Sequence, residues 1–500
     1  MLAEQTVIIG IICYFAVIIL VGYLMKNKNK GAEDFLVGGR SFGLFFNAGT
    51  LTACGLGGSL LIGVPGTIYS CGIWDSDARW GVLVTIAGIG CLIVLGAFYM
   101  RKLWQLKLLS LGDFYYLRFG KTAGIISTVL MSFTFTLWIA VQIVAFAKVG
   151  TTLVGIPLNA WIIISMAVIC TYTILGGLWA VCLTDIIQVI IVTISILLLA
   201  PIVLQMAGGW DSFVAALPKE KLEFLPQDKS IHGWLPWLAA WVIIGLGSVA
   251  SPDLMQRAFS AKTGRIARNS AFCAAGMCYF FIIVVGVLTF ATMQLIQQGS
   301  IETTLINADP ELLLPAVFEQ IMPAPVVVIF LGATMAAVMS AAATANIALS
   351  GVISKNLIKD IFIPQMSSYG VMQTTRVVIL FVGIIGAVVA IGLPSVYFLT
   401  SLGFDLILSC MFVPLTLGLY WKKTNGYGAT AGMIAGALVR IIGSGCVNGF
   451  TLEGIGTPTE TWYYFTLGGP IASLIVTLGV SLLTQKKNKP LELYFEPDPS

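Results

Sequence analysis

Residues 53–66 read ACGLGGSLLIGVPG and place a cluster of glycines and one proline inside the apolar run 43–71. Residues 245–252, GLGSVASP, repeat this feature in the run 236–256, five runs further along the chain. Interrupted membrane helices free backbone groups that line a cavity, and a matched pair of them indicates a repeated architecture. The spacing therefore predicts an inverted five-plus-five repeat with a ligand site at the two breaks. Close packing of helices through small residues is the simpler alternative.

The composition around these runs is that of a membrane protein. Of the 500 residues, 58% are apolar and only 10% are charged, and the mean hydropathy is +0.95. Soluble domains are a little under half apolar and about a quarter charged. A transmembrane β-barrel would alternate apolar and polar residues, which these continuous runs do not. We therefore predict an all-α polytopic membrane protein whose partners are the lipid bilayer and a small-molecule solute, with no binding of nucleic acid.

Thirteen apolar runs are long enough to cross a bilayer, which takes about 20 residues. They cover residues 6–25, 43–71, 80–100, 124–150, 157–175, 185–207, 236–256, 270–293, 323–354, 374–392, 398–421, 427–446 and 464–484. Of the 27 lysines and arginines, 21 fall in every second connection, at residues 26–42, 101–121, 257–269, 355–376, 422–423 and 485–500, with boundaries good to about four residues. Because cytoplasmic connections carry the excess of positive charge, we predict the amino terminus outside and the carboxyl terminus inside, at the plasma membrane.

The runs group into one membrane domain over residues 1–500. Residues 43–207 form the first five-helix repeat and residues 236–421 the second, with peripheral helices in 1–42 and 422–500. The polar, acidic connections 208–235 and 294–322 are expected to cap the outer side.

Several classes of function are excluded by missing residue patterns. No GxxxxGK followed by serine or threonine occurs, which excludes an ATP-driven pump. The single histidine, His232, lies in a polar connection, so no span offers the histidine of a catalytic pair, and the chain is not predicted to be an enzyme. The ten cysteines are scattered without metal-ligand spacing. A secondary transporter and an uncoupled facilitator or channel remain.

Two carboxylates and two hydroxyls in apolar runs are candidate functional groups. Asp185 and Asp405 would each cost at least ~2.5 kcal/mol in a bilayer unless they face a partner or water, so both are candidates by default. Asp185 could instead be a favourable charge at a helix amino terminus, and Asp405 could bond neighbouring backbone. Ser340 and Thr344 share a helix face, which is also common in plain helix packing.

Five motifs together resemble one family. They are FLVGGRSFG at 35–43, the glycine cluster at 53–66, LGGLWAVCLTDIIQ at 175–188, DLMQRAFS at 253–260 and AAVMS at 336–340. The chain resembles the sodium/solute symporters, which include proline, pantothenate, sialic acid, glucose and choline transporters. The resemblance implies a leucine-transporter-like fold with one extra amino-terminal and two extra carboxyl-terminal helices. It also implies alternating access to a central site.

The resemblance also implies sites for Na⁺ as the coupling ion. One sodium site of the family maps to Ala53, Leu56, Ala337, Ser340 and Ala341. Ala341 departs from the serine or threonine usual there and supplies no side-chain oxygen. A second family site maps to Asp185 and Thr344, with Ala343 in place of another hydroxyl. Proton coupling through Asp185 and uncoupled transport therefore remain as alternatives.

Candidate solute contacts come from the broken runs and the runs expected to face them. They are Gly55, Gly58, Ser59, Arg79, Trp138, Gln142, Ser248, Phe404 and Asp405. Arg79 is either a ligand for a carboxylate or an interfacial partner of Asp75 or Asp77. The expected solute is a carboxylate, an amino acid or a similar small molecule. Residues 423–429 are similar to the choline branch, but Gly55 stands where that branch has a tryptophan, which weakens the aromatic cage a quaternary ammonium needs.

Overall fold

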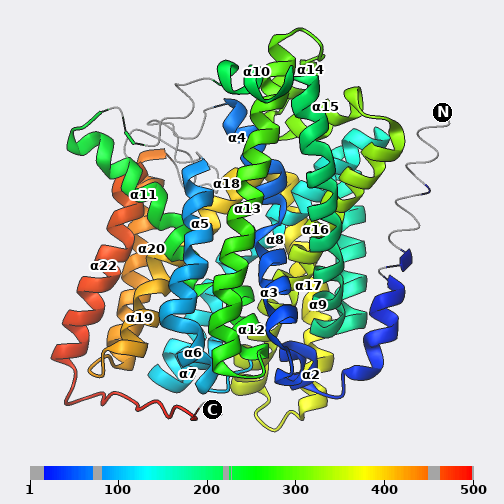
Figure 1. Ribbon diagram of the computed structural model, residues 1–500. Helices are drawn as coiled ribbons and strands as arrows, with labels where there is room; N and C mark the ends of the chain where they lie inside the picture. The colour runs from blue at the N-terminus through cyan, green and yellow to red at the C-terminus, as the bar shows by residue number, and fades with distance from the viewer. Residues whose placement is uncertain are drawn as a thin grey trace.

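The apolar runs form helices that stand side by side in a single bundle (Figure 1). In this computed structural model, the structure describes residues 9, 16–17, 19–70, 82–217, 225–226, 228–448 and 462–497. The short helices α10 (Gly209–Ala216), α14 (Thr304–Ala308) and α15 (Leu313–Ile321) lie at one end of the bundle. The helix α7 (Leu111–Phe119) and the carboxyl terminus lie at the other end.

The elements of the first half follow the predicted runs closely. In order they are η1 (Lys26–Lys28), α2 (Ala32–Val37), η2 (Gly38–Arg40), α3 (Leu44–Gly55), η3 (Ser59–Gly63), α4 (Val64–Ser70), α5 (Val82–Val94), η4 (Leu95–Tyr99), α6 (Met100–Gln105), α7, α8 (Lys121–Val154) and α9 (Leu158–Met206). Three of these, α5, η4 and α6, follow one another without a gap, so residues 82–105 are one continuous helical stretch.

The second half begins with another interrupted helix. In order its elements are α11 (Ile231–Gly247), η6 (Ser248–Ala250), α12 (Pro252–Ser260), α13 (Gly264–Gln297), α14, η7 (Pro310–Leu312), α15, α16 (Ala324–Val352), η8 (Ile353–Phe362), α17 (Ser368–Gly392), α18 (Val396–Ile407), η9 (Leu408–Phe412), α19 (Val413–Tyr420), α20 (Gly426–Asn448) and α22 (Trp462–Leu483).

The number of membrane-spanning helices differs from the prediction. Within the described residues, nine helices are long and apolar enough to cross a membrane, or ten if α3 and the stretch Ser59–Ser70 are one bent span. The predicted count of thirteen is therefore not confirmed. Part of the difference is that half of the run 6–25 lies outside the described residues. Another part is that α9 is counted once although its chain turns back at Gly177.

The turn inside α9 depends on one glycine. Gly177 has φ 58° and ψ −162°, a conformation that is essentially restricted to glycine. The hydroxyls of Tyr172 and Thr184 on either side of it are hydrogen-bonded to each other. Residues twelve apart in a straight helix would be about 18 Å apart along the axis, so the chain must reverse between them. The predicted runs 157–175 and 185–207 are thus joined by a tight turn rather than by a loop.

Both predicted breaks are present. α3 ends at Gly55 and the helix resumes at Ser59, with an angle of 47° between the two parts. α11 and η6 are separated from α12 by Ser251, whose φ of −80° and ψ of 123° are extended. The backbone N–H of Lys262 donates to the carbonyl of Phe42 (2.9 Å), which joins the chain just after α12 to the chain just before α3.

Candidate solute and cation site

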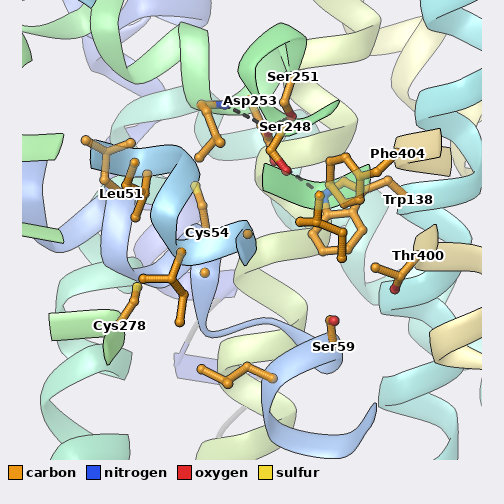
Figure 2. A pocket seen from close by; sticks show the side chains of 17 residues that line it. Leu51, Cys54, Ser59, Trp138, Ser248, Ser251, Asp253, Cys278, Thr400 and Phe404 are labelled. Atoms are coloured by element: carbon orange, nitrogen blue, oxygen red, sulfur yellow. Dashed lines mark hydrogen bonds between the residues drawn. The ribbon is translucent and has the colours of Figure 1, made fainter. Parts of the chain in front are cut away.

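A cavity lies where the two breaks approach each other (Figure 2). The broken helices supply most of its wall, and α5, α8, α13 and α18 supply the rest. Its lining consists of Leu51, Cys54, Gly55, Ser59, Leu60, Gly88, Ile89, Leu92, Trp138, Ile244, Ser248, Ser251, Asp253, Leu254, Cys278, Thr400 and Phe404. The wall is therefore mainly apolar, with three serines, one threonine and one carboxylate.

Asp253 brings the only formal charge to this lining within the described residues. It lies in the first turn of α12, where the free N–H groups of a helix favour a negative side chain. The hydroxyl of Ser251, the backbone N–H of Leu254 (2.7 Å) and the indole N–H of Trp138 (3.3 Å) donate to its carboxylate. These donors are neutral, and in the part of the chain that the structure describes no salt bridge reaches Asp253. Its carboxylate remains able to attract a cation.

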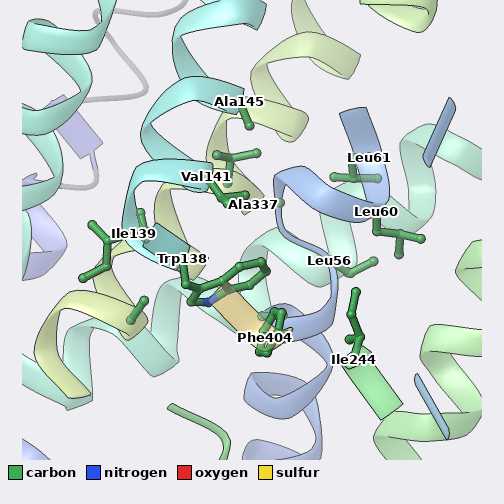
Figure 3. Packing of buried hydrophobic residues seen from close by; sticks show 14 of the residues in the cluster. Leu56, Leu60, Leu61, Trp138, Ile139, Val141, Ala145, Ile244, Ala337 and Phe404 are labelled. Carbon is green, nitrogen blue, oxygen red and sulfur yellow. The ribbon is translucent and has the colours of Figure 1, made fainter. Parts of the chain in front are cut away.

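An aromatic wall stands beside this carboxylate. The rings of Trp138 on α8 and Phe404 on α18 have centroids 5.1 Å apart. Figure 3 shows these two rings against each other, near Leu56 and Leu60 from the first break. Aromatic faces attract cations, so the wall and the carboxylate favour the same kind of solute.

An amide side chain forms a hydrogen bond with the backbone of the first break. Gln142, one turn along α8 from Trp138, accepts a hydrogen bond from the backbone N–H of Gly58 (2.9 Å). Gly58 packs directly against Ala145, so a side chain there would clash with α8. Gln142 thus satisfies one of the backbone groups that the interrupted helix leaves without an intrahelical partner.

The structure brings together five of the nine predicted solute contacts. Gly55, Ser59, Trp138, Ser248 and Phe404 line the cavity. Gly58 and Gln142 lie just behind the lining and bond to each other. Arg79, with Asp75 and Asp77, lies outside the described residues.

Asp405 does not line the cavity. Its carboxylate accepts hydrogen bonds from Arg440 Nε (2.7 Å) and Thr466 Oγ1 (2.8 Å), and it is fully buried among α18, α20 and α22. An ion pair between helices, rather than solute or neighbouring backbone, is what the structure shows for this carboxylate.

The residues predicted for the second sodium site are gathered around an arginine. Asp185 lies two turns beyond Gly177, inside the second part of α9, and so is not a charge at a helix start. Its Oδ1 accepts a hydrogen bond from the hydroxyl of Ser340, and its Oδ2 is 3.1 Å from Nη2 of Arg257. The same Nη2 donates to Thr344 Oγ1 (2.7 Å).

The residues predicted for the first sodium site lie on the two elements that meet beside the cavity. Ala53 and Leu56 are at the end of α3, and Ala337 and Ser340 are on α16. A Cβ on Gly57 would be 3.2 Å from the Cβ of Ala341, so this break faces α16 directly. Backbone carbonyls near the end of a helix and a nearby hydroxyl are oxygen ligands of the kind that suits Na⁺. The described residues contain no group of three or more histidines, cysteines or carboxylates that could hold another metal.

The comparisons with known proteins agree with these features. The model of the sodium:solute symporter family matches residues 35–436. The chain belongs to the sodium:solute symporter family. It is 26% identical to the human high affinity choline transporter 1 over 87% of this chain and 76% of the relative. It is 26% identical to the sodium/proline symporter of Escherichia coli over 86% of each chain.

A solved structure shares the fold. The structure described as a substrate-bound, outward-open Na⁺-coupled sialic acid symporter superposes with a TM-score of 0.80, at 16% identity, over 98% of this chain and 99% of that one. The protein is thus an integral membrane protein of a transporter fold, and the family and the relatives named here are transporters rather than enzymes.

Two residues of the site were missed by sequence reasoning. Asp253 lies in the predicted run 236–256, where the criterion that selected Asp185 and Asp405 applies to it equally. Arg257 was counted among the positive charges of a cytoplasmic connection, but the structure buries it completely in α12. The sequence signal for both was their place directly after the second glycine and proline cluster.

Proposed function

We propose that this symporter uses the sodium gradient to take up a small organic solute that carries a positively charged nitrogen with N–H groups. The observation that carries the proposal is the Asp253 carboxylate in a cavity whose other walls are apolar, aromatic or neutral. An amine or an amino acid is the chemical class that fits, by alternating access to the cavity between the two breaks. A carboxylate without such a nitrogen would add a second negative charge beside Asp253.

The cost of burying charge supports this class of solute. A buried carboxylate is costly unless it is paired, and a solute ammonium would supply the missing pair. The hydroxyls of Ser248, Ser251 and Thr400 can accept the N–H groups of a primary or secondary ammonium. Choline has no such N–H groups, and a complete aromatic cage is not formed where Gly55 and Ser251 line the cavity. The named relatives transport choline or proline, both of which carry a cationic nitrogen.

Sodium would bind next to this cavity. The carbonyls of Ala53, Leu56 and Ala337 and the hydroxyl of Ser340 would hold it. Because these groups come from two different helices, the bound ion would favour the conformation in which both helices are placed to bind the solute. The Ser340 hydroxyl donates a hydrogen bond to Asp185, so the lone pairs of its oxygen can still face the ion. Proton coupling and uncoupled transport are the competing modes.

The wider architecture belongs to the same proposal. The five-helix repeats at 43–207 and 236–421 would carry one break each, with the remaining helices at the periphery. The amino terminus would face outward and the carboxyl terminus the cytoplasm, in the plasma membrane. Under this orientation the end with α10, α14 and α15 is external.

Solute-dependent thermal stability of the purified protein tests the solute class. Wild type in Na⁺ is expected to be stabilised by amines or amino acids and not by carboxylates that lack an amino nitrogen. Asp253→Asn removes a charge-assisted contact and should weaken that binding about tenfold or more. Asp211→Asn, at an exposed site on α10, is the matched control and should bind like wild type. Binding of simple carboxylates that is indifferent to Asp253→Asn would contradict the proposal.

A further inference from the structure

A second cluster of buried charge lies close to the cavity but does not line it. Arg257 of α12, Asp185 of α9, and Ser340 and Thr344 of α16 come together with at most 1% of any of them exposed. Three helices thus each contribute polar groups to one small volume inside the membrane. Charges in such a place are costly and are retained where they serve a purpose.

The guanidinium takes the position of a cation among oxygens. Its Nη2 reaches both the Asp185 carboxylate (3.1 Å) and the Thr344 hydroxyl (2.7 Å), and Nη1 donates to Gln256 Oε1 (3.2 Å). Its Nε has no acceptor within the described residues. The Asp185 carboxylate and the Thr344 hydroxyl are hard oxygen ligands that a small inorganic cation would also use.

We propose that Arg257 is a resident cation: its guanidinium occupies a cation site formed by Asp185 and Thr344, so that no second sodium ion binds there. The charges at the centre of the molecule agree with this. Within the described residues Arg257 forms its salt bridge with Asp185 and none with Asp253, whose carboxylate lines the solute cavity. The inference rests on the proposed sodium coupling, and it adds that one sodium ion accompanies each solute.

A purely structural clamp between α9, α12 and α16 is the alternative. Whether Arg257 is a resident cation or a structural clamp, Arg257→Ala should lower the stability of the protein, because removing one partner of a buried ion pair leaves the other charge uncompensated. The two readings differ in what happens to the vacated oxygens. If Arg257 is a resident cation, its removal leaves a site that sodium can fill. If Arg257 is only a clamp, its removal leaves a cavity that does not bind sodium.

Sodium binding separates the two readings without any transport measurement. Purified wild type and variants are dialysed against ²²Na⁺ at constant ionic strength with K⁺ as the replacing ion, and thermal stability is followed in the same series. Wild type should bind one sodium ion per chain. Arg257→Ala should bind two, and its melting temperature should rise more steeply with sodium than that of wild type. Arg257→Lys keeps a tethered cation and should bind one.

The double variant Arg257→Ala with Asp185→Asn is the decisive control, and it should lose the extra ion. An Arg257→Ala variant that binds no more sodium than wild type would show a clamp and overturn the proposal. Two sodium ions bound to wild type would overturn it as well.

If Arg257→Ala does not fold, Asp185→Asn decides. The number of bound sodium ions should stay at one, and loss of a sodium ion would make Asp185 a sodium ligand and overturn the assignment. Wild type without any bound sodium would instead refute the sodium coupling, while a gain of one ion by Arg257→Ala would still support the resident cation.

Discussion

The carboxylates of Asp185, Asp253 and Asp405 are all buried, but each has a different set of partners. Asp405 pairs with Arg440 and Thr466, and Asp185 pairs with Arg257 and Ser340. Asp253 receives only neutral donors and is the one of the three that lines the cavity. A buried charge that already has its ion pair has little to gain from a solute, so we expect Asp253, rather than Asp185 or Asp405, to recognise the solute.

The sodium affinity is predicted to depend on a hydroxyl that is missing at position 341. Ala341 lies against the first break, next to the position of Gly57. Ala341→Ser would add an oxygen to a site otherwise made of carbonyls and one hydroxyl, and we expect it to lower the sodium concentration for half-maximal uptake. Ser340→Ala should raise that concentration or remove the sodium effect. Equal sodium dependence in both variants and wild type would place the ion elsewhere.

Sequence reasoning found two of these carboxylates, Asp185 and Asp405, but not their partners. An isolated charge in an apolar run is visible from hydropathy alone, which selected Asp185 and Asp405. Their arginine partners lie 72 and 35 positions further along the chain, and such pairs are made only by the packing of helices. For this reason Asp405 was expected at the cavity, and Arg257 was expected at the membrane surface.

At the scale of elements, glycine and proline clusters predicted where helices are interrupted, but not how sharply the chain turns. The breaks after Gly55 and at Ser251 fall where the sequence places them. Hydropathy also separated the two parts of α9, but it left a connection of nine residues between 175 and 185. The structure needs only Gly177 for the reversal, because one residue in a conformation open to glycine can redirect a whole helix.

The turn at Gly177 gives a prediction about stability. Gly177→Ala would place a Cβ 2.7 Å from Phe35 Cδ2 and 3.0 Å from Asn29 Oδ1, at a φ of +58°. We expect a loss of at least about 1–3 kcal/mol from backbone strain, measured as a lower melting temperature and poorer yield of folded protein. Gly286→Ala is the matched control, since nothing lies within 4 Å of its Cβ in α13, and it should be neutral or slightly stabilising. A Gly177→Ala protein as stable as wild type would show that the turn does not need glycine at this position.

At the scale of the whole molecule, one short segment ties several spans together at a single end of the bundle. Glu311 of η7 accepts hydrogen bonds from Lys148 Nζ of α8 (2.5 Å) and from the backbone N–H groups of Val396 (3.2 Å) and Tyr397 (3.0 Å) at the start of α18. Its Cα would be 2.8 Å from a Cβ on Gly66 of α4, so the segment also rests on the first broken helix. If the protein works by the proposed alternating access, such a link would be broken and remade in each cycle.

Glu311→Gln should therefore favour opening at that end. It removes the charge that Lys148 and the start of α18 share, while Lys148 keeps its second partner Asp309 (2.6 Å). We expect faster reaction of Cys54, which lines the cavity, with a small thiol reagent in a chain that retains this cysteine alone. Glu302→Gln, an exposed change on the same connection, should leave the rate unaltered. An unchanged rate in Glu311→Gln would mean that the link does not control access.

Sodium-driven accumulation in liposomes shows whether the protein couples solute uptake to the sodium gradient. Purified protein is reconstituted, and uptake of an amino-nitrogen solute that stabilises it is followed under an inward sodium gradient at zero membrane potential. We predict accumulation above the outside concentration, its collapse when a sodium ionophore removes the gradient, and its loss in Asp253→Asn but not in Asp211→Asn. Accumulation that is driven by an imposed proton gradient and does not depend on sodium would contradict sodium coupling. Uptake that ends when the solute concentrations inside and outside are equal would contradict it as well.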